Sequence, residues 1–362
     1  MSTRREFLTQ AAVATVMTSA AAAPVAVAES KAAPATATTG KPAGPMKTYT
    51  IPHTDLVVSR LAYGNAMIGS DWNSPDFIAQ TVPVIRAAYE QGITFFDTAD
   101  VYAHGKSEEA LGQVLKDIPG SRHRLVIQSK SGIIEGGAID SSREHITSAV
   151  EGSLKRLGSD RLDILLLHWP DDLVQPQEVA QAFDDLQRAG KVRYFGVSNY
   201  SPAQIELLRT QVRQPLVINQ IQLGLAHWYT EASPSKGAIT HGAEGVATLD
   251  YCRTHDIQVQ AYSPLKAESV GKPPNLLNAP ADAPAEERAA AQALQDVART
   301  HDCSPAAVML AWLLHHPAGI VPIIGATKAE HVIDNCAADR IELSRAEWYA
   351  LLRAAAKIGQ HA

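Results

Sequence analysis

Short apolar segments alternate with longer amphipathic segments along most of this 362-residue chain. Eight of the short segments have the length and the β-branched and aromatic content of buried strands. They span residues 60–63, 94–97, 125–129, 162–167, 194–197, 217–221, 258–261 and 320–324. Eight alternating strand and helix units predict a single α/β domain folded as a (β/α)8 barrel, preceded by a small hairpin over residues 49–58.

The amphipathic segments predict helices between these strands. They span residues 77–91, 107–115, 142–157, 176–189, 202–211, 246–255, 286–300 and 305–315. Ser201 and Ser304 each precede a proline, a pattern typical of an N-cap followed by proline in the first helical turn. A doubly wound open sheet is the alternative fold. Its dinucleotide-binding form has a G-x-G-x-x-G turn after an early strand, and the absence of that turn here favours the barrel.

The N-terminal 28 residues differ from the rest of the chain. Arg4 and Arg5 precede an alanine-rich apolar stretch that ends in the small-residue pattern Ala-Val-Ala at 26–28. This order predicts a twin-arginine signal peptide over residues 1–28, and hence export to the periplasm by the twin-arginine translocation machinery. Residues 29–46 are rich in Pro, Ala, Thr and Lys, which predicts a flexible linker. The barrel would then occupy residues 47–362.

Charge and composition exclude several classes of partner. The net charge is −6 and no block of Lys or Arg occurs, so we expect no nucleic-acid partner. After residue 30 no apolar run is long enough for a stable membrane span. Cys252, Cys303 and Cys336 lack metal-ligand spacing and allow at most one intramolecular disulfide. We therefore expect no metal site and, by default, buried free thiols.

Four polar residues follow three adjacent strands of the predicted barrel. Asp97 ends the second strand, and Tyr102 lies in the loop beyond it. Lys130 follows the third strand and His168 the fourth. In such barrels the carboxyl ends of the strands meet at one mouth, where the chemistry takes place. The sequence therefore predicts that an acid, a phenol, an ammonium group and an imidazole converge there.

These four groups suit proton donation to a carbonyl oxygen. A free phenol titrates near 10, and an adjacent ammonium group favours the phenolate, so we expect Lys130 to lower the pKa of Tyr102. Asp97 can pair with Lys130 and offset part of the cost of burying it. Neutral His168 can donate a hydrogen bond that orients the carbonyl oxygen, which Tyr102 would then protonate.

Six ordered motifs accompany the strand ends. They are Phe96-Asp97-Thr98-Ala99-Asp100-Val101-Tyr102 with Gly105-x-Ser107-Glu108, Gln128-Ser129-Lys130, Leu166-Leu167-His168-Trp169-Pro170-Asp171, Gly196-Val197-Ser198-Asn199, Asn219-Gln220 and Ala261-Tyr262-Ser263-Pro264-Leu265. Through these motifs the chain resembles the aldo-keto reductase family from about residue 49 to its end. The resemblance implies NAD(P)H-dependent reduction of an aldehyde or ketone to an alcohol, with a small-molecule carbonyl substrate. Tyr102 would be the general acid, Lys130 and Asp97 would tune it, and His168 would position the substrate.

The resemblance also implies a binding site for NADP, with NAD possible. Ser198, Asn199 and Gln220 match positions that bind the carboxamide, and Tyr262 matches the ring stacked on the nicotinamide. The remaining candidates are Gly64 and Asn65 after the first strand, Ser263 and Leu265 on the pyrophosphate side, and Gly325, Thr327, Lys328, His331 and Asn335 around the adenosine phosphate. NADPH-specific members often have an arginine where His331 stands, and histidine cannot reproduce its bidentate, permanently charged grip on a 2′-phosphate. The preference between NADPH and NADH therefore stays open.

The stretch 224–245 is too long for an ordinary connection after the sixth strand. We expect it to lie over the mouth. Together with Trp72, Trp169 and Trp228, it would wall the substrate pocket.

Two other functions remain open. Lys130 could be the Schiff-base nucleophile of an aldolase. The chain could also be a non-catalytic nucleotide-binding barrel, serving as a sensor or as a subunit of a larger assembly.

Overall fold

The computed structural model describes residues 46–67, 70–227, 245–265 and 275–358. The predicted signal peptide, nearly all of the predicted linker and most of the stretch 224–245 lie outside these residues. Within the described part, no helix is long and apolar enough to cross a membrane. Cys252, Cys303 and Cys336 are free thiols, and two of them are buried.

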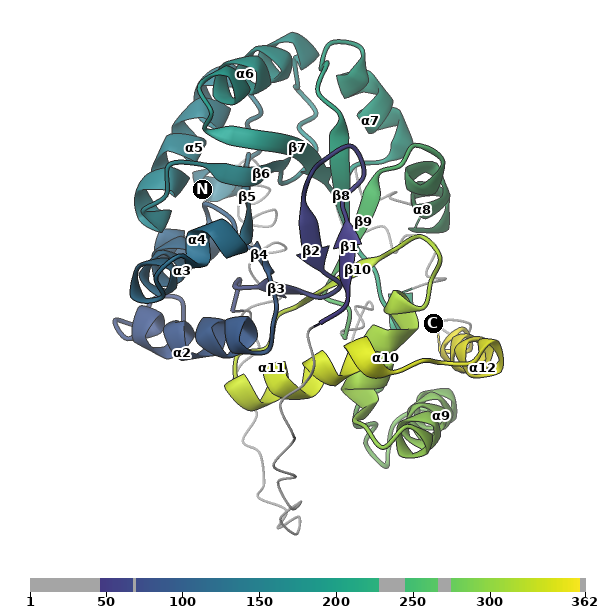
Figure 1. Cartoon of the computed structure of the whole chain (residues 1–362). Helices are drawn as coiled ribbons and strands as arrows, with labels where there is room; N and C mark the ends of the chain where they lie inside the picture. The colour runs from purple at the N-terminus through teal and green to yellow at the C-terminus, as the bar shows by residue number, and fades with distance from the viewer. Residues whose placement is uncertain (1–45, 68–69, 228–244, 266–274, 359–362) are drawn as a thin grey trace, which may run out of the picture.

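Eight parallel strands close into a barrel in the order β10-β3-β4-β5-β6-β7-β8-β9 (Figure 1). They are β3 (Ala62–Gly64), β4 (Phe95–Asp97), β5 (Val126–Ser131), β6 (Leu162–Leu167), β7 (Val192–Ser198), β8 (Leu216–Gln222), β9 (Gln258–Tyr262) and β10 (Val321–Ile324). Each predicted strand is confirmed to within a few residues. The alternative of an open doubly wound sheet is wrong, because β10 pairs with β3 and closes the ring.

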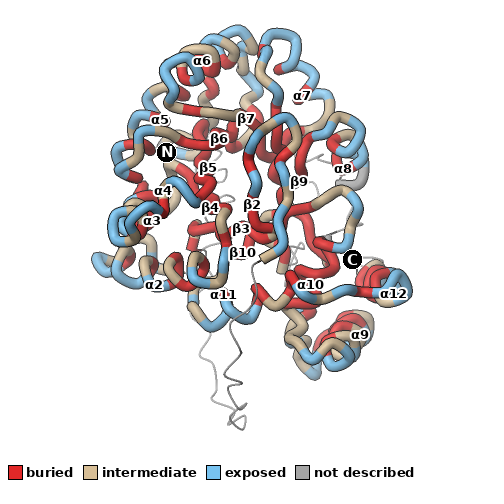
Figure 2. Tube along the Cα trace, in the orientation of Figure 1, coloured by how far each residue is buried: buried red, intermediate tan, exposed pale blue. Residues whose placement is uncertain are grey.

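Helices surround the barrel, with their outer faces exposed and the strands buried (Figure 2). They are α2 (Phe77–Glu90), α3 (Lys106–Asp117), α4 (Ser121–Arg124), α5 (Arg143–Leu157), α6 (Pro176–Arg188), α7 (Pro202–Arg209), α8 (Gly245–Thr254), α9 (Ala285–Thr300), α10 (Pro305–Leu314), α11 (Ala329–Cys336) and α12 (Arg345–Ala355). Short 3-10 helices are η1 (Tyr102–Gly105), η2 (Glu135–Gly137), η3 (Leu225–His227) and η4 (Ala337–Arg340). Helices α4, α11 and α12 were not predicted from the sequence.

The predicted helix starts at Ser201 and Ser304 are confirmed. The Ser201 hydroxyl accepts a hydrogen bond from the backbone N–H of Gln204, whose side chain reaches back to complete a capping box. The Ser304 hydroxyl accepts from the N–H of Ala307 at 3.1 Å. Each cap satisfies a backbone donor that the first helical turn would leave without a partner.

An antiparallel hairpin of β1 (Thr48–Thr50) and β2 (Val57–Ser59) precedes the barrel, as predicted. Its side chains Ile51, Leu56 and Val58 are buried against the apolar interior at the N-terminal end of the barrel. Figure 1 shows the hairpin lying across the ring of strands. The hairpin therefore plugs the N-terminal end of the barrel.

The barrel interior changes from apolar to polar along the strands. Phe95 in β4 and Val126 in β5 belong to the apolar cluster under the hairpin. Two residues further along the same strands, Asp97 and Gln128 are also buried, and they are register partners of each other. Because side chains two apart in a strand share a face, these polar groups point into the same interior. The polar half of the barrel lies at the C-terminal mouth.

Shortening a buried side chain of the β1–β2 hairpin is expected to destabilise the fold. Val58→Ala removes buried apolar surface under the hairpin, so we expect a loss of roughly 1.5–3 kcal/mol in the free energy of unfolding. Urea denaturation measures this loss. Val57→Ala is the matched control, since Val57 is 56% exposed on the opposite face of the same strand. Equal losses for the two variants would show that the hairpin does not close the core.

Candidate active site

Asp97, Tyr102, Lys130 and His168 lie together at the C-terminal mouth of the barrel. The Lys130 Nζ donates hydrogen bonds to Asp97 Oδ2 at 2.7 Å, to the carbonyl oxygen of Thr98 at 2.9 Å and to the Tyr102 hydroxyl at 3.2 Å. The rings of Tyr102 and His168 meet edge to face, with centroids 5.6 Å apart. The side-chain cluster predicted from the sequence is therefore present in the structure.

Lys130 is completely buried and holds its charge through these contacts. Burial alone would lower its pKa, but Asp97 and Tyr102 outweigh that effect and raise it above the ordinary value. An ammonium group has three N–H donors, and each has an acceptor here. A protonated, fully bonded lysine is a poor nucleophile, which argues against the aldolase alternative.

Tyr102 and His168 are both in their neutral forms near pH 7. Burial raises the pKa of Tyr102, while Lys130 acts to lower it. The expected lowering by Lys130 is thus real but smaller than the desolvation, so our expectation of a net decrease was wrong. Burial and the charge of Lys130 hold the pKa of His168 well below its usual value. The phenol keeps its proton, and the imidazole can donate a neutral hydrogen bond.

A tight turn fixes Tyr102 beyond β4. The Asp100 N–H donates to the carbonyl oxygen of Lys130 at 3.2 Å, which joins the loop to β5. After Tyr102, the left-handed residues Ala103 and His104 have φ of 49° and 56°, and Gly105 has φ of 89°. Left-handed conformations of non-glycine residues cost roughly 1–3 kcal/mol each and often occur at functional sites. The strained turn directs the chain into α3 and leaves the phenol beside Lys130.

Ser198, Asn199 and Tyr262 form one hydrogen-bonded group at the same mouth. Asn199 Nδ2 donates to Ser198 Oγ at 3.0 Å, and the Tyr262 hydroxyl donates to Asn199 Oδ1 at 3.0 Å. Asn199 and Ser263 have φ of 65° and 50°, so strain recurs here. These are the residues expected to hold the nicotinamide, and the structure brings them together. Their contacts with a cofactor stay predictions.

Gln220 is oriented by the barrel interior. Its Nε2 donates to Asp97 Oδ1 and to Gln260 Oε1, both at 2.9 Å. Gln128 Nε2 makes bonds to the same two acceptors, at 2.6 and 2.8 Å. Gln128 belongs to one of the strand-end motifs, but no role was predicted for it or for Gln260 from the sequence. Their alternation with apolar residues in buried strands was the available signal.

Gly64 and Asn65, two further cofactor candidates, have structural roles. A Cβ on Gly64 would lie 2.6 Å from Ile323 Cγ2, so the close approach of β3 to β10 requires glycine there. The Asn65 Nδ2 donates to the carbonyl oxygen of Ser107, whose hydroxyl donates to the carbonyl oxygen of Asn65, both at 2.8 Å. These bonds fasten α3 to β3. A cofactor contact of either residue stays a prediction.

The adenosine-phosphate candidates gather around the start of α11. Gly325 and Thr327 lie between β10 and α11, Lys328 is the N-cap residue of α11, and His331 lies in its first turn. The Lys328 and His331 side chains are exposed, whereas Asn335 is buried. A lysine at a helix N-terminus suits a phosphate, because the helix dipole and the ammonium charge act together. These residues fit the phosphate end of a dinucleotide, and Leu265 is half-buried after β9.

Two of the three predicted pocket tryptophans can be placed. Trp72 is half-buried, and its Nε1 donates to the carbonyl oxygen of Ala66 at 3.1 Å. Trp169 is half-buried and follows His168 directly. Trp228 lies outside the described residues. The predicted substrate pocket therefore has two placed candidates beside the mouth.

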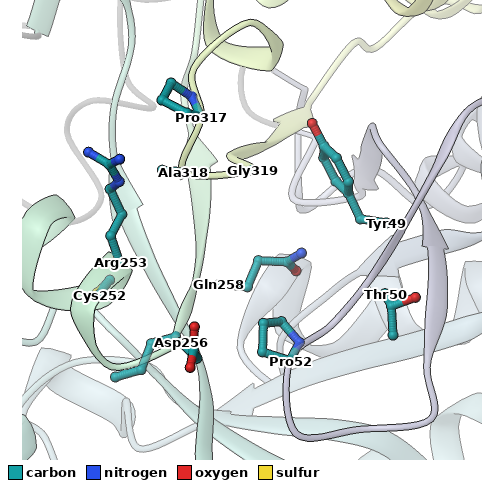
Figure 3. A pocket seen from close by; sticks show the side chains of 11 residues that line it. Tyr49, Thr50, Pro52, Cys252, Arg253, Asp256, Gln258, Pro317, Ala318 and Gly319 are labelled. Carbon is teal, nitrogen blue, oxygen red and sulfur yellow. The ribbon is translucent and has the colours of Figure 1, made fainter.

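A separate hollow lies at the N-terminal end of the barrel (Figure 3). It has a volume of ≈ 320 Å³ and is lined by hairpin residues, including Tyr49 and Pro52, and by Arg253, Asp256 and Gln258 around the start of β9. The four-residue cluster lies at the opposite end of the strands. The hollow therefore has no part in chemistry at the mouth.

The chain matches a model of the aldo/keto reductase family over residues 60–356. It belongs to that family. A 6-dehydroglucose reductase of Novosphingobium aromaticivorans is 33% identical to it over 84% of this chain and 93% of its own length. Two solved structures are each 27% identical to it. A glycerol dehydrogenase from Gluconobacter oxydans has a TM-score of 0.70 and covers 87% of this chain and 97% of its own. A Klebsiella pneumoniae aldo-keto reductase in complex with NADPH has a TM-score of 0.62, with coverages of 82% and 91%.

Membership of this family makes the protein an NAD(P)H-dependent oxidoreductase. Its barrel fold, which the resemblance implied, is the fold that the structure shows.

Asp100 is an ionisable group of the site for which no role was predicted from the sequence. Burial and the nearby Glu108 raise its pKa to about 7. Its Oδ1 is buried and has no hydrogen-bond partner among the described residues. Between the unfolded and folded pKa values, the folded protein holds a proton that the unfolded chain has released. The stability from this group is therefore present at low pH and declines as the pH rises to about 7.

Asp100→Asn should remove that decline. We expect the variant to gain roughly 2–3 kcal/mol in the free energy of unfolding, relative to the wild type, between pH 5 and pH 8. Urea denaturation at the two pH values measures the gain, with exposed Asp172→Asn as the control. A difference between Asp100→Asn and the wild type that is the same at both pH values would contradict the raised pKa.

Proposed function

We propose that this enzyme reduces a small aldehyde or ketone to an alcohol, with Tyr102 as the general acid. The observation that carries the proposal is the ammonium group of Lys130, which is hydrogen-bonded to both Asp97 and Tyr102. A half-buried phenol that keeps its proton at pH 7, beside a fixed cation, can donate a proton and then be stabilised as a phenolate.

The proton transfer follows from the positions of these groups. When bound, the dihydronicotinamide supplies the hydride to the carbonyl carbon. Neutral His168 donates a hydrogen bond to the carbonyl oxygen and orients it towards Tyr102. The phenolic O–H bond breaks, the proton moves to the substrate oxygen, and an alcohol O–H bond forms. Lys130, 3.2 Å from the phenolic oxygen, stabilises the negative charge that develops there, while Asp97 keeps Lys130 in place.

The same geometry supports catalysis over a purely nucleotide-binding role. A sensor would have no need for a buried ion pair aimed at a phenol, and burying two charges without function is costly. The non-catalytic alternative predicts that loss of the Tyr102 hydroxyl leaves every activity unchanged.

NADP(H) is the cofactor that we propose. The Klebsiella pneumoniae relative was solved with NADPH, and Lys328 presents an exposed ammonium group at the N-terminus of α11. Ser198, Asn199 and Gln220 would hold the carboxamide, and Tyr262 would stack on the nicotinamide. Substrates named for relatives, such as 6-dehydroglucose, belong in the panel to be tested.

Export is a further proposal. The order of Arg4, Arg5, the apolar stretch and the Ala-Val-Ala pattern supports cleavage after residue 28 and a periplasmic location. The twin-arginine route carries folded proteins, so the barrel would fold around its cofactor before it crosses the membrane.

Tyr102→Phe is expected to lower kcat for carbonyl reduction by roughly 10²–10⁴-fold, because it removes the general acid. NADPH oxidation with benzaldehyde, methylglyoxal and 6-dehydroglucose measures the rate. Fluorescence titration with NADPH and NADH, under identical salt, should give the same affinities for the variant and the wild type. The ratio of the two affinities also tests whether Lys328 suffices for NADPH preference with histidine at position 331.

Full activity in Tyr102→Phe with cofactor binding intact would indicate another proton donor. Absence of carbonyl reduction by both the wild type and the variant, with cofactor binding intact, would favour the non-catalytic barrel. Absence of saturable binding of either nucleotide to the wild type would reject the reductase site itself.

The double substitution Arg4→Lys with Arg5→Lys should keep the protein in the cytoplasm, since the translocase recognises the arginine pair. Fractionation and immunoblotting of a bacterium with a twin-arginine translocase measure this. The control changes two linker lysines, Lys31→Gln with Lys41→Gln, and leaves export unchanged. An equal periplasmic fraction for both double variants would argue against this signal.

A further inference from the structure

Three glutamines cross the barrel interior behind the predicted proton donor. Gln128 lies in β5, Gln220 in β8 and Gln260 in β9, and all three are buried. In the strand order of the barrel, β8 lies opposite β4 and β9 lies opposite β5. Their hydrogen bonds therefore span the barrel from one wall to the other and end on Asp97.

The bonding within this glutamine cluster is almost fully specified. Gln128 Nε2 and Gln220 Nε2 each donate to Asp97 Oδ1, at 2.6 and 2.9 Å, and each also donates to Gln260 Oε1. Gln260 Nε2 returns a bond to Gln128 Oε1 at 2.9 Å. A flipped amide at Gln128 or Gln220 would put an oxygen against the Asp97 carboxylate. The charge of Asp97 therefore fixes which amide atom points where.

The two carboxylate oxygens of Asp97 accept hydrogen bonds from different groups. Oδ2 accepts from Lys130 at 2.7 Å, whereas Oδ1 accepts only from the two glutamines among the described residues. An apolar interior of the same volume would leave Oδ1 buried without a donor. A buried carboxylate oxygen without a donor favours the protonated acid. A neutral Asp97 would in turn no longer hold a charged Lys130 beside Tyr102.

We propose that Gln128, Gln220 and Gln260 are positioning residues of the reduction. Through the Asp97 carboxylate they keep the Lys130 ammonium charged and in place beside the general acid. The cluster also joins the proton-donating side of the site to Gln220, the residue expected at the nicotinamide carboxamide. This inference rests on the proposed function, since it assigns roles around Tyr102.

The groups that face Tyr102 determine whether loss of the Asp97–Lys130 ion pair makes the phenol a stronger or a weaker acid. These groups are Asp97 on β4, Asp100 in the loop after it, Lys130 on β5 and His168 after β6, with Glu108 on α3 and Arg156 on α5 acting on Asp100. Lys130 lowers the pKa of the phenol and Asp97 raises it, and Lys130 has the larger effect. Neutralising both members of the ion pair would therefore leave a weaker acid and a slower proton transfer.

The test compares two substitutions at Gln128. Gln128→Met keeps the shape of the side chain but removes its donors. We expect kcat for benzaldehyde reduction to fall about tenfold or more, the loss expected when a buried charged group loses one hydrogen bond. The dissociation constant for NADPH, from fluorescence titration, should stay within about twofold of the wild-type value.

Gln128→Glu gives a signature that a space-filling role would not produce. Two carboxyl groups in contact share a proton, and one of their pKa values is strongly raised. At low pH the shared proton replaces the amide donor, so kcat should approach that of the wild type. As the pH rises the proton is lost, and kcat should fall in a limb that the wild type lacks. Asp100 titrates in both proteins, and a ratio of their pH profiles removes its contribution.

Gln258→Met is the matched control. Gln258 is also buried, lies two residues from Gln260 in β9 and has no bond to Asp97. Its kcat should match the wild type. If Gln128→Met does not fold, Gln260→Met replaces it, since that change removes the acceptor shared by Gln128 and Gln220. In an Asp97→Asn background the effect of either substitution should largely disappear.

The outcomes separate this inference from the proposed function. Unchanged kcat in the Gln128→Met or Gln260→Met protein, with a Gln128→Glu profile parallel to the wild type, overturns the role of the cluster alone, provided that Tyr102→Phe is inactive. An active Tyr102→Phe protein instead rejects the proposed function, and the inference falls with it.

Discussion

The buried ion pair between Asp97 and Lys130 is the interaction on which the polar, C-terminal half of the barrel depends. Two charges removed from water lose more solvation than their attraction returns, unless further hydrogen bonds satisfy the remaining donors and acceptors. Here Thr98 and Tyr102 accept the remaining hydrogen bonds of the ammonium group, and two glutamine amides donate hydrogen bonds to the carboxylate. The polar interior of the mouth is therefore the environment that allows this pair to stay ionised.

The apolar, N-terminal half of the barrel contributes hydrophobic burial, which the polar, C-terminal half lacks. The hairpin side chains and the apolar cluster beneath them provide burial with no polar groups to satisfy. The two halves are built on the same strands, two residues apart, so a change of face or register in one strand would disturb both. Stability and chemistry are thus divided along the barrel axis rather than between separate domains.

Much of this arrangement could be predicted from the sequence because it depends on local patterns. The eight strands can be predicted from apolar periodicity. The cluster of Asp97, Tyr102, Lys130 and His168 can be predicted from the polar residues at the ends of three adjacent strands. The strand-to-strand contacts of Gln128 and Gln260 could not be predicted, because they depend on which walls of a closed barrel face each other. The net shift in the pKa of Tyr102 was also missed, since desolvation depends on the full packing. Helix α12 did have a local signal, a capping box at Ser344 and Glu347.

The commitment of both N–H groups of Gln220 has a consequence for ligand discrimination. An amide normally offers a donor and an acceptor, and so tolerates either an amide or an acid opposite it. With its nitrogen bonded to Asp97 and Gln260, Gln220 can offer a ligand only an oxygen. A carboxamide can donate to that oxygen, whereas the carboxylate of a deamidated dinucleotide would be repelled by it. If the carboxamide binds at Gln220 as proposed, this bonding would select the amide form of the cofactor over its nicotinic-acid precursors.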